Sequence, residues 1–220
     1  MSTWTGVVAA GSGTRFGGDK QLADLSGMAV LVRSVASASA VSAGVVVVVS
    51  AGRRAAVSGV LSGLERVEAI VDGGATRSES VRCGLAAVPD GAGVVLVHDG
   101  ARPLATPDLF RRVVDAVLAG AVAVVPGVPV TDSLRTADGR VMARDDVTAV
   151  QTPQGFNAER LRSAHAGGGE ASDDATLVEA AGGTVVVVEG EASNLKITRP
   201  ADLDLARLEL ERIVAGSSDA

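Results

Sequence analysis

Residues 7–20 read VVAAGSGTRFGGDK: an apolar strand is followed at once by a glycine-rich loop that carries Arg15 and Lys20. Glycine has no Cβ, so the backbone N–H groups of such a loop can approach a phosphate closely. The two cations add charge that backbone amides lack. The stretch predicts a strand-to-loop turn that binds the triphosphate of a nucleotide, although taken alone it also fits a structural turn with surface cations.

Composition favours a domain that binds small molecules. The 220 residues can bury a core without disulfides. The chain has three Phe, one Trp and no Tyr, and its net charge is −6, so we expect neither nucleic acid nor membrane as a partner. The single Cys83 fits a reducing compartment, and no signal peptide or membrane span is apparent. These features predict a cytoplasmic protein.

Short valine-rich runs alternate with amphipathic segments along the chain. The runs lack polar alternation, as is typical of strands covered on both faces, and they lie at 45–49, 94–97, 121–125 and 185–188. Helical patterns lie at 77–88, at 106–118 and from Pro200 onward. The alternation predicts an α/β fold with a Rossmann-like, mostly parallel sheet and helices on both faces.

Residues 126–150 interrupt this alternation with two prolines and a polar stretch. The Asp138-Gly139 pair within them predicts a hairpin turn. We expect a β-arm projecting from a single domain of residues 1–215, with a frayed tail at 216–220. Because projecting arms tend to be buried against a second subunit, we expect a homodimer.

Two further clusters are placed to bind phosphates or a base. DGGATRSESV, residues 72–81, puts paired glycines and Ser80 at a helix N-terminus, where N–H groups and hydroxyls can read a base edge or hold an anion. HDGARP, residues 98–103, follows a strand, so Asp99 can hold a metal ion and Arg102 a second anion. An ordinary capped helix and an Asp99–Arg102 salt bridge are the alternatives.

The glycine-rich loop alone also allows a dinucleotide-binding reductase. Arg53 and Arg54, after the second predicted strand, would then suit a 2′-phosphate. However, Gly17-Gly18-Asp19 is a poor helix start, and a short-chain reductase needs a catalytic tyrosine that this chain lacks. We therefore disfavour this interpretation.

In their order and spacing, these clusters resemble the 2-C-methyl-D-erythritol 4-phosphate cytidylyltransferases of the non-mevalonate isoprenoid pathway, from Val8 to about Leu208. The matching patterns are AAGxGxR with its following lysine, GGxxRxxSV, HDxAR, QTPQ and NxKIT, at 9–20, 73–81, 98–102, 151–154 and 194–198. The chain departs from the family in a shorter Arg15–Lys20 stretch and at Val8 and Asp19 (usually Pro), Gly100 (usually Ala), and Ser133 and Ser172 (usually Thr).

The resemblance implies transfer of a cytidylyl group from CTP to a polyol phosphate, with Mg²⁺ or another divalent cation as cofactor. It assigns catalysis to Arg15 and Lys20. It assigns CTP binding to Ala9, Ala10, Gly11, Ser12, Gly13, Gly73, Gly74, Ser80 and Asp99, and the metal to Asp99. It assigns the polyol phosphate to Arg102, Ser133, Arg144, Thr152, Ser172 and Lys196. Since Ser133 and Arg144 lie on the arm, a dimer would present them to a neighbouring subunit.

Three other functions stay open from the sequence. A ribitol 5-phosphate cytidylyltransferase shares most of these motifs, although that group tends to have Val where this chain has Ala101. A guanylyl- or sugar-1-phosphate nucleotidyltransferase fits the loop but not HDxAR or QTPQ. A catalytically silent nucleotide-binding homologue fits the altered Val8 and Asp19, although the chain retains the other cations.

Overall fold

The computed structural model describes residues 1–11 and 13–217. Ser12, a predicted CTP-binding residue, and residues 218–220 of the expected tail lie outside the described residues. The last helix, α7 (Pro200–Ser217), includes the first two residues of that tail.

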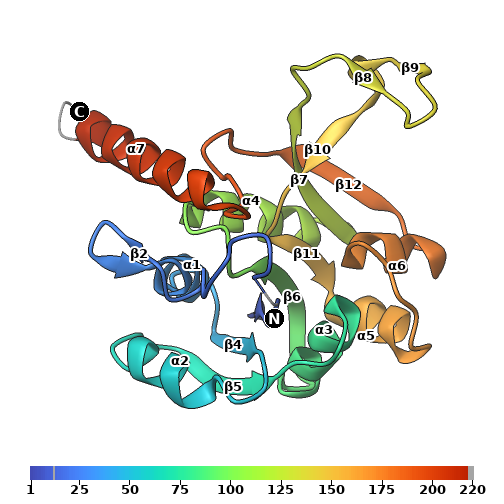
Figure 1. Ribbon diagram of the computed structural model, residues 1–220. Helices are drawn as coiled ribbons and strands as arrows, with labels where there is room; N and C mark the ends of the chain where they lie inside the picture. Colours follow the sequence, from blue (N-terminus) through green and yellow to red (C-terminus); the bar gives the residue numbers. More distant parts are fainter. Residues whose placement is uncertain (12, 218–220) are drawn as a thin grey trace.

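A mixed sheet of eight strands forms the centre of the described part of the chain (Figure 1). Its order is β10 (Thr148–Val150), β7 (Ala123–Pro129), β11 (Gln154–Asn157), β6 (Ala92–Asp99), β1 (Ser2–Ala9), β4 (Gly44–Val49) and β5 (Val67–Asp72), with β12 (Val185–Glu189) paired to β7. The pairs that include β10 or β11 are antiparallel and the others are parallel. The predicted, mostly parallel sheet is confirmed.

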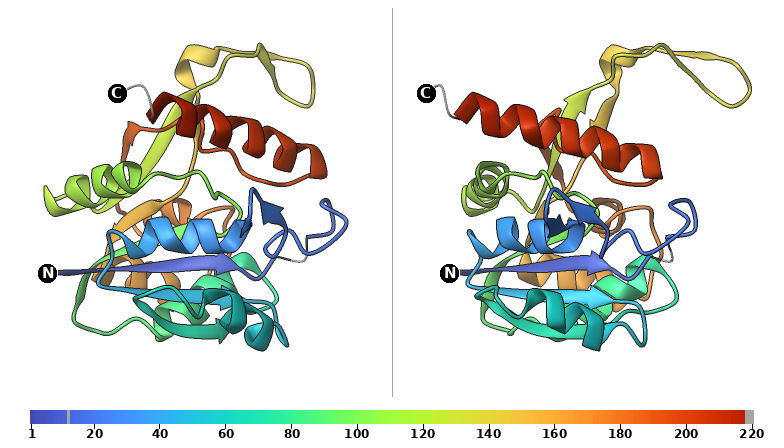
Figure 2. Two further views of the ribbon diagram at one scale, coloured as in Figure 1. Left: turned by 90° about the vertical axis from the view of Figure 1, so that its left-hand side faces the viewer. Right: turned by 60° about the vertical axis from the view of Figure 1, so that its left-hand side comes forward.

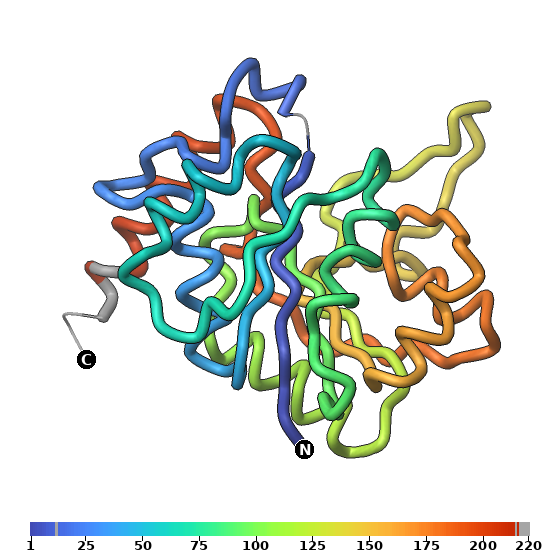
Figure 3. Tube along the Cα trace, turned by 90° about the horizontal axis from the view of Figure 1, so that it is seen from below, coloured from blue at the N-terminus to red at the C-terminus, as the bar shows by residue number. Residues whose placement is uncertain are grey.

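Both faces of the sheet are covered, which explains the unbroken valine runs. All six residues of β4 are buried, and successive side chains point to opposite faces of the sheet. Val45 and Val47 belong to the hydrophobic cluster on one face, and Val46 belongs to the cluster on the other. One face packs against α1 (Val30–Ser39), α2 (Arg54–Leu61) and α4 (Pro107–Leu118). The other packs against α3 (Arg77–Ala86), α5 (Ala158–Ala166) and α6 (Asp174–Ala180). Figure 3 shows these helices on either side of β1, as predicted.

The valine run of β12 is the exception, because this strand is not covered on both faces as expected. It lies at the edge of the sheet beside β7, and Val186 and Val187 are exposed. Valine favours β-structure in either setting, so its presence alone does not separate an edge strand from a central one. Likewise β7 begins at Ala123, two residues later than expected, and continues to Pro129.

Capping residues define the helices that border the candidate site. Thr76 and Glu79 form a capping box at the start of α3. Thr106 caps α4, and Pro107 occupies its first turn, as predicted. None of the helices in the described ranges is long and apolar enough to span a membrane.

The predicted arm is present between β7 and β10. Its tip is a hairpin of β8 (Leu134–Arg135) and β9 (Val141–Met142), with the Asp138-Gly139 turn between them, followed by the 3₁₀ turn η1 (Arg144–Asp146). The arm projects away from the layered core (Figures 1 and 2). On another side, α7 packs with the short β2 (Asp24–Leu25) and β3 (Met28–Ala29) segment over a small third cluster around Ile197.

Candidate functional site

Parallel strands β1, β5 and β6 end at one edge of the sheet, and the loops that follow them surround a pocket of about 420 Å³. Ligands of open α/β sheets bind outside such carboxyl ends. The pocket brings together eight predicted site residues: Ala10, Gly11, Arg15, Lys20, Gly74, Ser80, Asp99 and Lys196. It also contains Gln21 and Arg77, which the resemblance leaves without a role.

The glycine-rich loop turns sharply at Gly13. Its φ is +65°, and a Cβ there would lie 2.7 Å from the carbonyl oxygen of Gly18. The backbone N–H groups of Phe16 and Gly17 donate to the Gly13 carbonyl at 2.9 and 3.1 Å. Only glycine tolerates both the conformation and the close approach, so the loop folds back and Arg15 lines the pocket.

Lys20 reaches the pocket despite the shortened loop. Its Nζ donates to the Ile197 carbonyl at 3.2 Å. Burial, with the nearby charges of Lys196 and Arg15, lowers the pKa of Lys20, and Asp99 only partly opposes this shift. In the free protein, the Lys20 ammonium is therefore repelled by the charges of Lys196 and Arg15. The negative charge of a bound polyphosphate would offset this repulsion.

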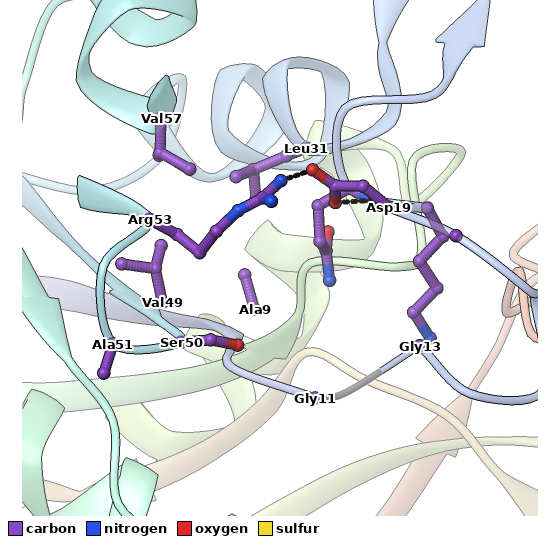
Figure 4. A pocket seen from close by; sticks show the side chains of 13 residues that line it. Ala9, Gly11, Gly13, Asp19, Leu31, Val49, Ser50, Ala51, Arg53 and Val57 are labelled. Atoms are coloured by element: carbon purple, nitrogen blue, oxygen red, sulfur yellow. Dashed lines mark hydrogen bonds and ion pairs between the residues drawn. The ribbon is translucent and has the colours of Figure 1, made fainter. Parts of the chain in front are cut away.

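Asp19, next to Lys20, ties the loop to the segment after β4. Its carboxylate forms an ion pair with Arg53 and accepts a hydrogen bond from the Gln21 backbone N–H at 3.2 Å. Figure 4 shows Arg53 and Asp19 pointing toward one another beside a second hollow of about 330 Å³. Ala9 and Gly13, both predicted to bind CTP, line this hollow together with Gly11.

The turn after β5, which is predicted to read the base, packs tightly against the glycine-rich loop. A Cβ on Gly73 would lie 2.6 Å from Ser80 Oγ and 2.7 Å from Ala10 Cβ. The missing side chain thus lets residues after β5 approach residues after β1. The Ser80 hydroxyl donates to the Thr76 carbonyl at 2.9 Å, which fixes its orientation at the start of α3.

Asp99 is the centre of charge in the pocket. Its Oδ2 lies 2.8 Å from Lys196 Nζ and 3.7 Å from Arg102 Nε. Burial raises the pKa of Asp99, but the charges of Lys196, Arg77 and Arg102 outweigh burial and hold this pKa below its usual range. Asp99 is therefore ionised at neutral pH, and the expected salt bridge with Arg102 is one part of a larger cluster.

A buried chain of hydrogen bonds supports Asp99 from behind. Burial lowers the pKa of His98 to about 4, so its ring is neutral at neutral pH. The ring contacts the Arg102 carbonyl through Nε2 at 3.2 Å and the Thr152 hydroxyl through Nδ1 at 3.2 Å. A carbonyl only accepts, so the proton is on Nε2. Thr152 Oγ1 in turn accepts from the Asp99 N–H at 3.0 Å, which gives Thr152 a supporting place beside the pocket.

Two buried amides that the sequence analysis did not assign join the segment before Lys196 to the QTPQ segment. Gln151 pairs with the Glu191 backbone: its Oε1 accepts at 3.1 Å and its Nε2 donates at 2.8 Å. Asn194 Nδ2 donates to the Thr152 carbonyl at 3.0 Å, and the backbone carbonyl of Asn194 accepts from Arg102 Nη1 at 2.7 Å. The QTPQ and NxKIT motifs contain both amides, so the motifs were the available signal.

Of the six predicted substrate residues, Lys196 is the one that lines the pocket in the described structure; Arg102 and Thr152 contact Asp99 beside it, and the other three lie elsewhere. Ser133 and Arg144 lie on the arm, where Arg144 donates to the Thr131 carbonyl at 3.0 Å and lies 3.8 Å from Asp145. Ser172 is exposed just before α6. Their roles toward a substrate stay predictions.

The predicted metal ligand is Asp99. In the described ranges, no group of three or more His, Cys, Asp or Glu side chains could hold a metal ion. Mg²⁺ needs only one or two carboxylates when substrate phosphates and water complete its shell. One ionised carboxylate in a phosphate-sized pocket thus fits a cation that arrives with a nucleotide.

Comparison with known proteins agrees with this geometry. The family model for 2-C-methyl-D-erythritol 4-phosphate cytidylyltransferase matches residues 5–212. An enzyme of that name from Rhodococcus jostii is 44% identical, over 93% of each chain. The bifunctional enzyme IspD/IspF of Clavibacter michiganensis is 43% identical over 97% of this chain, which spans 55% of that protein's length.

Solved structures show the same likeness. The 2-C-methyl-D-erythritol 4-phosphate cytidylyltransferase of Thermus thermophilus is 37% identical, with a TM-score of 0.75 over 94% of this chain and 97% of that one. The 4-diphosphocytidyl-2C-methyl-D-erythritol synthase of Anaerococcus prevotii is 27% identical, with a TM-score of 0.83 over 96% and 98%.

Proposed function

This chain belongs to the 2-C-methyl-D-erythritol 4-phosphate cytidylyltransferase family, and from that premise we propose that it transfers the cytidylyl group of CTP to 2-C-methyl-D-erythritol 4-phosphate. One observation carries the proposal: a single pocket joins the glycine-rich loop, the turn before α3 and the Asp99–Lys196 pair. The enzyme is thus a nucleotidyltransferase that needs space for two phosphorylated substrates.

The reaction does not require a general base. A phosphate monoester has a second pKa of about 6, so its oxygens are already mostly anionic at neutral pH. One of these oxygens attacks the α-phosphorus in line, the bond from that phosphorus to the oxygen that joins it to the β-phosphorus breaks, and pyrophosphate leaves with that oxygen. Catalysis then consists of positioning two anions and stabilising charge in the transition state.

The nucleotide half of the site comes from the core. The backbone of Ala9 to Gly13, Ser12 included, holds the triphosphate, and Gly73, Gly74 and Ser80 read cytosine. Arg15 and Lys20 stabilise the charge that develops around the α-phosphate. Burial, followed by repulsion from Lys196 and Arg15, lowers the pKa of Lys20, and the repulsion supports this role because a bound triphosphate would supply counter-charge.

Asp99 is the residue that would hold Mg²⁺ or another divalent cation, and such a cation would neutralise negative charge on the phosphates of CTP. Its carboxylate is held in place by the buried support from Thr152 and His98.

The acceptor half of the site combines core and arm residues. Arg102, Thr152, Ser172 and Lys196 come from the core, and Ser133 and Arg144 from the arm. Because the arm projects away from the layered core (Figure 2) and neither Ser133 nor Arg144 lines the pocket of its own chain, we propose a homodimer in which each arm completes the site of the other subunit. The proposal includes a cytoplasmic location, which the single Cys83 supports because it excludes an intramolecular disulfide.

Pyrophosphate release tests this function directly. The enzyme is incubated with CTP and Mg²⁺ and either 2-C-methyl-D-erythritol 4-phosphate, ribitol 5-phosphate or no acceptor. We expect release with the methylerythritol substrate, little with ribitol 5-phosphate, and none with CTP alone. Preferential turnover of ribitol 5-phosphate would show that the chain is a ribitol 5-phosphate cytidylyltransferase. CTP binding without turnover of either acceptor would identify a catalytically silent homologue.

A further inference from the structure

Arg77 occupies a position in the pocket between the base-reading turn and the reaction centre. It is the first residue of α3, three residues before Ser80, and it lines the pocket together with Gly74 and Asp99. Its charge is near enough to Asp99 to contribute to the lowered pKa of that carboxyl. The ribose of CTP must lie between the base and the α-phosphorus that reacts, and Arg77 lines the pocket between the residues assigned to these two parts of the nucleotide.

A fully buried carboxylate holds Arg77 from behind. Asp174, at the start of α6, has no exposed side-chain surface, and its Oδ2 lies 2.8 Å from Arg77 Nη1. The other oxygen, Oδ1, accepts from His165 Nε2 of α5 at 3.0 Å. Burying a carboxylate is costly unless it is paired, so this arrangement needs both partners. By contrast, the Arg77 side chain is 26% exposed, on the pocket side.

Other contacts dock the α5–α6 loop on α3, so Asp174 and Arg77 belong to one packed unit. Arg82 donates to the Gly169 carbonyl at 3.0 Å and pairs with Glu170 at 2.9 Å. Figure 3 shows the orange segment around residues 160–180 beside the green segment of α3. Asp174 is thus fixed by its surroundings, and Arg77 takes its direction from Asp174.

We propose that Arg77 donates hydrogen bonds to the transferred cytidylyl group, and that Asp174, supported by His165, is a positioning residue that holds Arg77 in that orientation. The inference rests on the proposed function. Because the ion pair with Asp174 offsets the charge of Arg77, its main contribution is a fixed set of donors rather than net positive charge.

A double-mutant cycle tests the proposal, with two readouts: the Kd for CTP in the absence of acceptor, and kcat/KM for CTP. Arg77→Ala should weaken CTP binding about tenfold or more, the scale of a lost charge-assisted hydrogen bond. Asp174→Asn should weaken it by less. The double variant should be no worse than Arg77→Ala alone, because Asp174 acts only through Arg77. Unchanged CTP affinity in Arg77→Ala, or additive losses in the cycle, would overturn the proposal.

Two additions keep the result interpretable. Asp115→Asn, at an exposed position of α4, is the matched control and should leave both readouts unchanged. If Asp174→Asn does not fold, His165→Asn replaces it in the cycle, with the same two outcomes. Wild-type pyrophosphate release is measured in parallel. If the wild type releases no pyrophosphate, the proposed function is wrong. If release is normal and the variants keep the wild-type Kd and kcat/KM for CTP, only this inference is wrong.

Discussion

The pocket and the arm hold their charged side chains in different ways. In the pocket, Asp99 is 13% exposed and lies within 4 Å of two cations. On the arm, Arg144 is 56% exposed, and its ionic partner Asp145 is 95% exposed. Exposed pairs contribute little to orientation or stability, whereas buried and hydrogen-bonded ones are fixed. The charged side chains of the pocket are therefore fixed within one chain, whereas those of the arm would gain a defined direction only against a second surface, as the proposed dimer would supply.

The largest effect is expected at the loop that begins the nucleotide half. Arg15→Ala should lower kcat by about 10²–10³-fold, the usual cost of one donor to a developing oxyanion, with the fold unchanged. Steady-state pyrophosphate release measures the loss, and circular dichroism checks the fold. Near-normal turnover would show that the pocket does not contain the reaction centre.

Arg144→Ala should raise the KM for the sugar phosphate about tenfold or more, as expected for one lost charge-assisted contact. The KM for CTP and the melting temperature should change little, because Arg144 is exposed on the arm and does not line the pocket that contains Asp99. Lys196→Ala is the core counterpart and should raise the same KM. A rise in the KM for CTP alone would show that Arg144 acts on CTP and not on the sugar phosphate.

Gln151→Ala, beside the pocket, should lower the free energy of unfolding more than a substitution on the arm does. It removes two hydrogen bonds that Gln151 makes with Glu191, and we expect a loss of about 2–3 kcal/mol in the free energy of unfolding. Arg140→Ala in the exposed hairpin is the control, with a change within about 0.5 kcal/mol. Urea denaturation measures both. Equal stability of the two variants would mean that the amide support is dispensable.

The pH profile tests the charge density around Lys20. Its pKa is lowered by burial first, and then by Lys196 and Arg15, so this ammonium loses its proton at a lower pH than an ordinary lysine. Charged Lys20 costs stability below its folded pKa, and that cost disappears as the pH rises toward the unfolded value. We expect kcat/KM for CTP to fall on the alkaline side and Lys20→Arg to move that fall to higher pH. An identical alkaline limb in both proteins would assign it to another group.

The smallest effect is expected at Arg53, which pairs with Asp19 on the outer side of the loop. The pair is partly exposed, so Arg53→Ala should reduce kcat/KM for CTP by a few-fold at most. A loss as large as that of Arg15→Ala would mean that this ion pair, rather than the tight turn at Gly13, sets the position of the loop.

Most of the core could be predicted because it follows local rules. Valine runs become strands, Thr106 and Pro107 begin a helix, and Asp138-Gly139 makes a turn. The exposed edge of β12 could not be predicted in this way, because which strand ends the sheet is decided by pairing between distant segments.

The site divides along the same line. Its glycine-rich loop is a continuous motif, and the structure places Arg15 and Lys20 in one pocket with Asp99. The supports are contacts between residues far apart in the sequence, such as Gln151 with Glu191 and Arg77 with Asp174. Spacing along the chain carries no information about such pairs, so the sequence indicated the motifs but not what holds them.

Mixed dimers test most directly whether the arm completes the site of a second subunit. Arg15→Ala and Arg144→Ala subunits are assayed separately and after co-refolding in equal amounts, at subsaturating sugar phosphate. Half of the dimers are then mixed, and in each of these one site has an intact loop and an intact partner arm, so the account predicts about one quarter of wild-type activity. Activity no greater than the average of the separate variants would contradict it and leave the arm outside the site.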